Sequence, residues 1–263
     1  MNERPLVAFT LLSQTAVGAF LTLGALDLWA RTLAGDAVAR ALTNGLLLAI
    51  GPVVGVAMFS SLLHLGSPRN AWRSAANLRT SWLSREIVCA LLFAGFGAAF
   101  AVSRWSGAGS AGLRTLLAIA GAVSGVALVY AEARVYRIRT VPRWDTPLTT
   151  VSFFATALLL GPLAVGTGLV LLPGIPDELV RGPLHWIALL AAAGFGAEIA
   201  AAGRGKLHGV RRLLLMAGVA LCVVLLLSDA RFAPALVATF VVALAAQVLG
   251  RYLFYMDGLR RAL

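Results

Sequence analysis

The sequence has few of the residues that soluble proteins use for metal binding, crosslinking and catalysis. Its 263 residues include only two cysteines and three histidines, and 13% of them are charged, whereas soluble domains carry about 25% charged residues. Two cysteines cannot supply the roughly four thiolates of an iron–sulfur cluster, and no disulfide framework is expected. Two bis-histidine haems would need one histidine more than the chain has.

Several sequence motifs are also missing. We find no GxGxxG or GxxxxGK[ST] phosphate loop, no cluster of residues with zinc-ligand spacing, and no arrangement that suggests a Ser-His-Asp triad. We therefore expect the chain to hold no haem, no metal and no other prosthetic group of its own.

Hydrophobic residues, by contrast, make up 60% of the chain and occur in long runs from one end to the other. A run of about 18 or more apolar residues is typical of a transmembrane helix, and these runs lack the alternation of a membrane β-strand. The sequence predicts an all-α integral membrane protein, a bundle of eight transmembrane helices that forms one domain, residues 1–263. The expected spans are Pro5–Trp29, Leu42–Leu65, Trp82–Val102, Leu113–Tyr136, Leu148–Leu172, Leu184–Ala202, Val210–Leu227 and Pro234–Tyr255.

The net charge of +11 is unevenly placed. An even number of spans puts both termini on one face, which we call side A, and sixteen of the 22 Lys and Arg residues then fall on that face. The positive-inside rule makes side A cytoplasmic. Basic residues between apolar spans argue against nucleic-acid binding, although a basic face can also dock an acidic partner.

Ionisable residues inside membrane spans are costly and often functional. The span directions place His64, Glu86, Glu132 and Glu198 near side A, and Asp27 and His185 toward the opposite face, side B. His64 and His185 therefore cannot share one metal ion. The sequence leaves simpler readings open: Glu132 could pair with the nearby Arg134, Tyr136 or Arg137, and Glu198 with Arg204.

His64 is the most informative of these residues. It ends an apolar run and is followed at once by "GSP", so its ring is expected where membrane meets water. Histidine has an ordinary pKa of about 6.5 and can exchange a proton at physiological pH. Glu86 is expected one turn into the next span, so the two groups should flank the same connection.

Small residues at GxxxG spacing occur at Gly51–Gly55 and Gly121–Gly125. Such spacing lets two helices approach closely in lipid, and we interpret both pairs as helix-packing sites.

Three longer segments carry a family resemblance. They are "SSLLHLGSPRNAWRSAANLRTSWLSREI", which contains His64 and Glu86, "ARVYRIRTVPRWDTPLTTVSFFATALLLG" (residues 133–161) and "GRYLFYMDG" (residues 250–258). The first has an HLG-x-P element and an S-x-L-S-x-E pattern. Together they resemble the membrane anchor subunit of the dimethyl sulfoxide reductase family (DmsC type), across nearly the whole chain.

The resemblance implies an anchor in the bacterial cytoplasmic (inner) membrane. It implies two partners, a molybdopterin catalytic subunit and a four-cluster ferredoxin-like iron–sulfur subunit, and menaquinol as the bound substrate. His64 and Glu86 would belong to the quinol site. Arg85 and Trp82, from the same segment, are further candidates for the quinol pocket.

Two alternatives remain open from the sequence. A related anchor could work in the opposite direction and reduce quinone with electrons from a sulfur compound. A small-molecule transporter is disfavoured, because its site would lie near the membrane midplane rather than near one face. The sequence also leaves open whether the partners lie in the cytoplasm or whether a basic docking surface biases the topology count.

Overall fold

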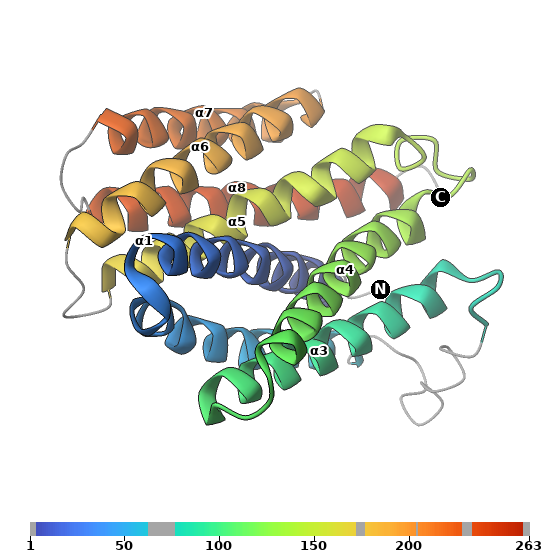
Figure 1. Cartoon of the computed structure of the whole chain (residues 1–263). Helices are drawn as coiled ribbons and strands as arrows, with labels where there is room; N and C mark the ends of the chain where they lie inside the picture. Colours follow the sequence, from blue (N-terminus) through green and yellow to red (C-terminus); the bar gives the residue numbers. More distant parts are fainter. Residues whose placement is uncertain (1–3, 63–76, 172–176, 204, 228–232, 260–263) are drawn as a thin grey trace.

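The computed structural model describes residues 4–62, 77–171, 177–203, 205–227 and 233–259. Within these ranges the regular structure is entirely helical, and each of the seven helices is long and apolar enough to cross a membrane (Figure 1). The helices are α1 (Arg4–Leu62), α3 (Trp82–Ser106), α4 (Ala111–Tyr136), α5 (Pro147–Leu171), α6 (Asp177–Ala201), α7 (Lys206–Leu227) and α8 (Ala233–Leu259).

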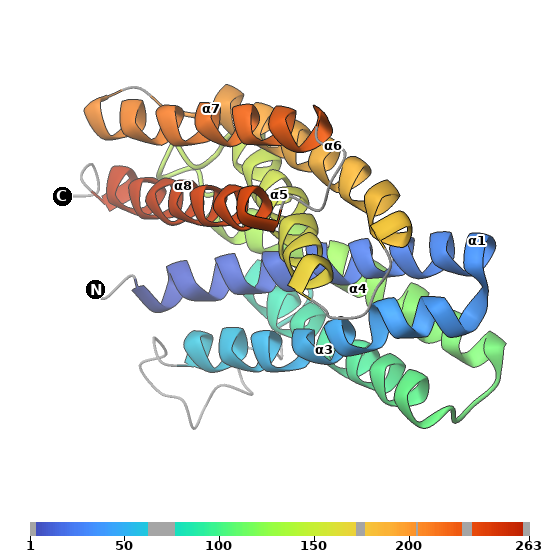
Figure 2. The ribbon, with the colours of Figure 1, turned by 90° about the vertical axis from the view of Figure 1, so that its left-hand side faces the viewer.

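The expected number of eight helices is not matched, because α1 includes the first expected span and the second as far as Leu62; the last three residues of that span lie outside the described residues. Gly35 interrupts α1 with φ 83° and ψ 173°, values that lie outside the helical region. Figure 2 shows that the chain reverses direction within α1, so residues 4–34 form a first arm and residues 36–62 a second arm. The sequence between the expected spans contains no proline. Helix therefore continues on both sides up to a glycine that can adopt positive φ.

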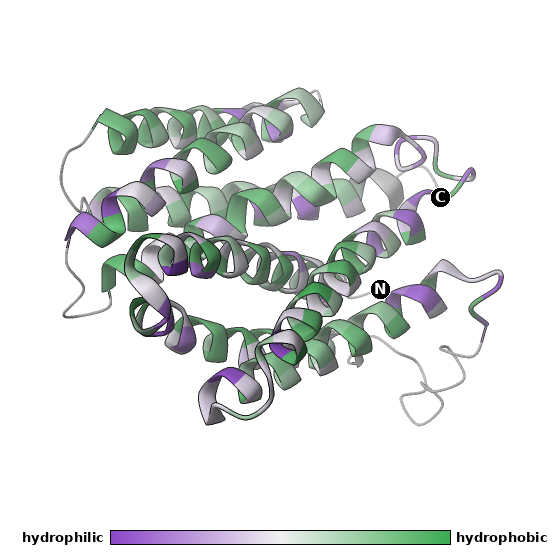
Figure 3. Cartoon of the chain, in the orientation of Figure 1, coloured by the Kyte–Doolittle hydropathy of each residue, from purple (hydrophilic) through white to green (hydrophobic). Residues whose placement is uncertain are grey.

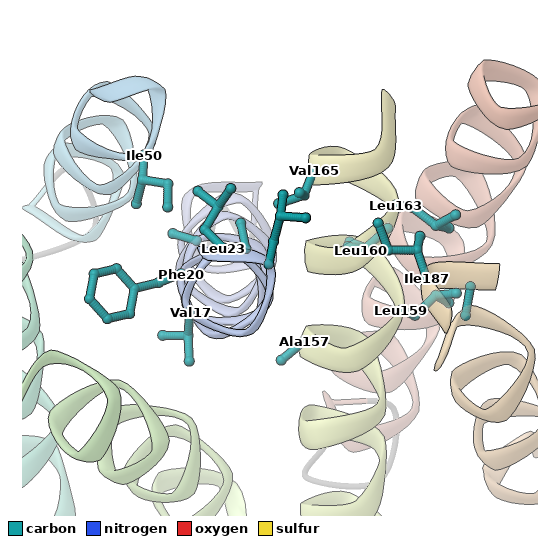
Figure 4. Packing of buried hydrophobic residues seen from close by; sticks show 14 of the residues in the cluster. Val17, Phe20, Leu23, Ile50, Ala157, Leu159, Leu160, Leu163, Val165 and Ile187 are labelled. Atoms are coloured by element: carbon teal, nitrogen blue, oxygen red, sulfur yellow. The ribbon is translucent and has the colours of Figure 1, made fainter. Parts of the chain in front are cut away.

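Helix α5 lies in the interior of the bundle. It packs against α1, α6 and α8, while α3 packs on α4 and α7 packs on α6 and α8. Leu159, Leu160 and Leu163 of α5 are fully buried. Figure 4 shows their side chains with Val17 and Phe20 of α1 in the same apolar core.

The outer surface of the bundle is apolar along most of its length. Figure 3 shows hydrophobic residues along the helices and hydrophilic residues mainly toward helix ends and connections. Leu91, Leu116, Leu213 and Val241 are each more than half exposed. In a hydrocarbon environment such side chains need no further cover, which agrees with the predicted membrane location.

The first arm of α1 and α5 touch backbone to backbone. A Cβ atom at Gly18 would lie 1.9 Å from the carbonyl oxygen of Ala157, and one at Gly161 would lie 2.2 Å from the carbonyl carbon of Gly18. Because no side chain fits between them, glycine is required at both positions for this crossing.

The two GxxxG pairs behave differently from expectation. No atom lies within 4 Å of a Cβ built at either end of Gly51–Gly55, so the predicted helix contact at this pair is wrong for the described residues. Gly121–Gly125 is indeed packed, but against the aromatic rings of Phe20 and Phe93 rather than against another helix backbone.

We expect Gly18→Ala to destabilise the protein and Gly24→Ala, on the same arm, to leave it unchanged or slightly more stable. An added methyl group at Gly18 meets the backbone of α5, and such overpacking costs about 1–3 kcal/mol. At Gly24 nothing lies within 4 Å, and alanine favours helix over glycine by about 1 kcal/mol. Thermal unfolding of both variants in the same detergent measures the difference, and equal midpoints would contradict the backbone contact.

Candidate functional site

The sequence segment around Glu86 forms the start of α3. Ser81 is the N-cap of this helix, and its side chain accepts a hydrogen bond from the backbone N–H of Ser84 at 3.2 Å. The cap fixes where the helix begins and so places Glu86 in its second turn. Glu86 is 7% exposed, which is a low value for a carboxylate. His64 lies outside the described residues, and its role stays a prediction.

Trp82 and Arg85 contact each other at the same helix end. The guanidinium of Arg85 lies 4.2 Å from the centre of the Trp82 ring, and that of Arg134 from α4 lies 4.8 Å from it. Arg85 also donates hydrogen bonds of 2.9 Å to the carbonyl oxygens of Leu78 and Arg79. These contacts hold the connection before α3 against α4. Whether Trp82 and Arg85 also touch quinol stays a prediction.

Glu132 of α4 is fully buried and does not use the partners that are nearest in sequence. It accepts hydrogen bonds from Ser13 and Gln14 on the first arm of α1, the second at 2.7 Å. The interpretation that Glu132 pairs with Arg134, Tyr136 or Arg137 is therefore not what the structure shows. Its carboxylate also interacts electrostatically with that of Glu86, so the two acids lie in one region of the bundle.

Glu198 of α6 is likewise fully buried. It forms an ion pair with Arg211 of α7 and accepts a hydrogen bond of 2.9 Å from Ser152 of α5. Arg204, the partner considered from the sequence, is not among the described residues.

Arg251 of α8 connects these two acids. Its guanidinium donates to Gln14 at 2.8 Å and to Thr156 of α5 at 3.2 Å, and it lies 3.9 Å from the centre of the Phe153 ring. Thr156 in turn contacts Gln247 and Glu198. We call the connected set the polar network; its members are Ser13, Gln14, Glu132, Ser152, Thr156, Glu198, Arg211, Gln247 and Arg251.

The second and third resemblance segments meet next to this network. The indole N–H of Trp144 donates to the carbonyl oxygen of Phe254 at 2.8 Å, and the two rings stack at 5.2 Å. The hydroxyl groups of Tyr136 and Tyr255 lie 3.0 Å apart. These contacts join two segments that are far apart in the sequence.

The opposite end of the bundle has its own ion pairs. Asp27 of α1 lies 2.7 Å from both Arg31 and the buried Arg104 of α3, and Arg104 also donates to Thr43 at 3.0 Å. His185 contacts the carbonyl oxygen of Arg181 at 2.8 Å. The contacts of Arg104 with Asp27 and Thr43 hold both arms of α1 to α3, and they are separate from the acids near Glu86.

A cavity of about 350 Å³ lies between the second arm of α1 and α3. Its lining is apolar and includes Gly51, Gly55, Phe93 and Gly97. Gly51 and Gly55 pack against no other helix and thus border open space beside α3, the helix that carries Glu86.

We expect Arg211→Leu to destabilise the protein strongly, because it leaves Glu198 buried without its ion-pair partner. Breaking a buried pair costs about 3–5 kcal/mol. The double variant Arg211→Leu/Glu198→Leu should recover much of this loss. The control is Arg40→Leu, which breaks the half-exposed ion pair between Arg40 and Asp36. It should lower the free energy of unfolding by no more than about 1 kcal/mol. Unfolding in detergent measures all three, and equal losses for Arg211→Leu and Arg40→Leu would contradict the expectation.

Comparisons with known proteins agree with these observations. The family model of the DMSO reductase anchor subunit (DmsC) matches residues 1–193. The anaerobic dimethyl sulfoxide reductase of Escherichia coli has a chain, designated C, that is 32% identical over 97% of the present sequence and 94% of its own length.

Two further relatives are similar to parts of the sequence. The equivalent chain of the anaerobic dimethyl sulfoxide reductase of Haemophilus influenzae is 28% identical, over 74% of the present sequence and 66% of its own length. A subunit of the sulfite dehydrogenase of Allochromatium vinosum, also designated C, is 30% identical, over 58% of the present sequence and 51% of its own length. With a matched family model, a relative aligned over nearly its full length and a bundle of apolar helices, this protein belongs to the DMSO reductase anchor subunit (DmsC) family.

Proposed function

We propose that the protein anchors a molybdopterin oxidoreductase of the dimethyl sulfoxide reductase type in the bacterial inner membrane and oxidises menaquinol there. In this proposal a four-cluster ferredoxin-like subunit receives the electrons and passes them to a molybdopterin catalytic subunit. The observation that carries it is the burial of Glu86 in the second turn of α3, inside the most specific resemblance segment.

Quinol oxidation releases two electrons and two protons, and the proton chemistry falls to this protein. His64 accepts a proton from a quinol hydroxyl, and Glu86 transfers a proton toward water at side A. The apolar cavity between the second arm of α1 and α3 offers room for part of the isoprenoid tail, as pockets between bundle helices commonly do. Electrons leave to the partner, since we expect no redox group in this chain.

The same proposal assigns the membrane topology. The two arms of α1 count as two crossings, which gives eight crossings in total. The start of α1 and the end of α8 lie at the same end of the bundle, as this topology requires (Figure 2). The sixteen basic residues of side A favour a cytoplasmic location for that end. They also offer a surface for docking the iron–sulfur subunit.

A second candidate function has one specific observation in its favour. Because one relative is named as a sulfite dehydrogenase subunit, the same site could take electrons from a sulfur compound and reduce quinone. The groups that bind quinol and exchange protons would be the same, so the two candidates differ in the direction of electron flow. Co-purified catalytic subunits would distinguish them.

We expect His64→Leu to abolish quinol-dependent reduction and to leave activity with a soluble artificial donor intact, because that donor feeds the partner subunits directly. General acid–base groups contribute about a hundredfold or more to rate. Glu86→Gln should reduce the quinol-dependent rate in part, since an amide keeps hydrogen bonding but carries no proton. Both rates are measured in membranes where all subunits assemble normally.

Glu178→Gln is the matched control. Glu178 is an exposed acid in the first turn of α6, and it lies outside all three resemblance segments. It should leave both rates unchanged. Full quinol-dependent activity in His64→Leu would overturn the assignment of this site and direct attention to Glu132 and Glu198.

A further inference from the structure

Glu132 of α4 and Glu86 of α3 face each other near side A. Two turns deeper in the bundle, a Cβ atom at Gly125 would lie 3.1 Å from both the Phe93 ring and the Val17 side chain, so α4, α3 and the first arm of α1 meet there. Seven residues are nearly two turns, so positions seven apart lie on almost the same face of a helix. Glu132 follows Gly125 by seven residues, and Glu86 precedes Phe93 by seven on the antiparallel α3. The two acids therefore occupy equivalent places two turns nearer to side A.

The hydrogen bonds of Glu132 are complete whether or not it carries a proton. Ser13 has a single hydroxyl hydrogen, and two acceptors share it, Glu132 and the carbonyl oxygen of Phe9 at 2.7 Å. When Glu132 is ionised, Ser13 donates to it. When Glu132 is protonated, its own hydrogen goes to the Ser13 oxygen, and Ser13 donates to Phe9. Gln14 donates to the second oxygen of Glu132 at 2.7 Å in both states. A change of protonation state thus leaves no group of this contact unsatisfied.

The charges around Glu132 also permit both states. Its hydrogen-bond partners are uncharged, and Arg251 reaches it through Gln14, whose amide oxygen accepts from Arg251 at 2.8 Å. Glu198 differs, because it is paired directly with Arg211 and losing one charge of a buried pair is costly. Of these two fully buried acids, Glu132 is therefore the one that can take up and release a proton.

Tyr136 offers a way from Glu132 toward side A. It is the last residue of α4, four residues after Glu132, and so lies on the same face of the helix. Long side chains of a helix point back toward its N-terminus, so the ring of Tyr136 leans toward Glu132. Its hydroxyl group lies 3.0 Å from that of Tyr255. Hydroxyl groups both donate and accept hydrogen bonds, and the pair can pass a proton onward.

The ionisable groups that interact with Glu132 within the described ranges come from three helices. They are Glu86 of α3, Tyr136 of α4, and Arg251 and Tyr255 of α8. The partners from the first arm of α1 are uncharged, and α5, which also packs on α4, contains no ionisable residue. Among these groups, Glu86 is the acid from which Glu132 can receive a proton.

We propose that Glu132 is the next proton carrier after Glu86. It receives the proton that Glu86 has taken from quinol and passes it toward the hydroxyl groups of Tyr136 and Tyr255 at side A. The inference rests on the proposed quinol oxidation, in which both electrons go to the iron–sulfur partner and the other proton goes to His64. One quinol O–H bond breaks, and the proton forms an O–H bond first on Glu86 and then on Glu132. Glu132 does not touch quinol and acts through Glu86.

The test compares three variants in membranes where all subunits assemble. Glu132→Gln removes the proton carrier but keeps the hydrogen bonds, since an amide can donate to Ser13 and accept from Gln14. Ser13→Ala keeps the carboxyl group and removes the hydroxyl that exchanges a hydrogen with it. Glu198→Gln is the control, a fully buried acid that is paired with Arg211 instead. The quinol-dependent rate is measured across pH and in D2O, and activity with a soluble artificial donor confirms assembly.

We expect Glu132→Gln to lower the quinol-dependent rate about tenfold at neutral pH, less than the loss of a group that contacts quinol. The deficit should shrink as pH rises, because Glu86 then releases its proton directly to water, where proton acceptors become more abundant. The rate should also fall more in D2O than it does in the unsubstituted complex, since proton transfer limits it. Ser13→Ala should show the same changes to a smaller degree. Glu198→Gln should alter neither the pH profile nor the solvent isotope effect.

A full rate in Glu132→Gln, or a lower rate with an unchanged pH profile and isotope effect, would overturn the proposal. So would the same changes in Glu198→Gln, because they would then follow from any disturbance of the polar network. Should Glu132→Gln fail to assemble, the pH profile and isotope effect of Ser13→Ala decide the question. A slow Glu86→Gln beside an unaffected Glu132→Gln overturns this inference alone, whereas full activity in Glu86→Gln overturns its role in the proposed function as well.

Discussion

Hydrocarbon offers no water to a buried carboxylate, and this constraint organises one end of the bundle. Glu132 and Glu198 are fully buried, and each finds its donors on other helices. Arg251 then joins both groups through Gln14 and Thr156. Apolar helix surfaces can slide past one another at little cost in lipid, but hydrogen bonds at fixed positions cannot. The polar network therefore fixes which helices are neighbours and in which register they pack.

The depth of the acids could be predicted from the sequence, whereas their partners could not. Helical rise and the direction of each span are enough to place Glu86, Glu132 and Glu198 toward one face. Which residue a carboxylate meets depends on how each helix is rotated and on which helices are adjacent. Neither property is encoded locally, so the sequence suggests possible partners close to Glu132 in the chain, whereas the structure shows Ser13 and Gln14. The signal available in the sequence was Gln14, a polar residue inside the first apolar run that needs a partner on another helix.

The GxxxG spacing alone also did not predict which glycines lie at a close contact between two helices. Gly51–Gly55 has the pattern of a packing motif but lines open space, while the tight crossing uses Gly18 and Gly161, which belong to no such pair. A close approach needs one small residue on each helix at the point of crossing, and that point is a property of two helices. The number of helices differed from expectation for a local reason, since helix continues up to Gly35 on both sides. His64 lies outside the described residues, and its prediction rests on the sequence.

The polar network also has a consequence for how relatives of this protein can diverge. The matched family region, residues 1–193, contains Gln14, Glu132 and Thr156, but Arg251 lies well beyond it. A substitution of Arg251 would leave a buried glutamine and threonine short of a donor on two helices at once. Lineages that replace this arginine should therefore carry compensating changes near the beginning and middle of the sequence. Substitutions in the last helix and in the first are therefore expected to occur together.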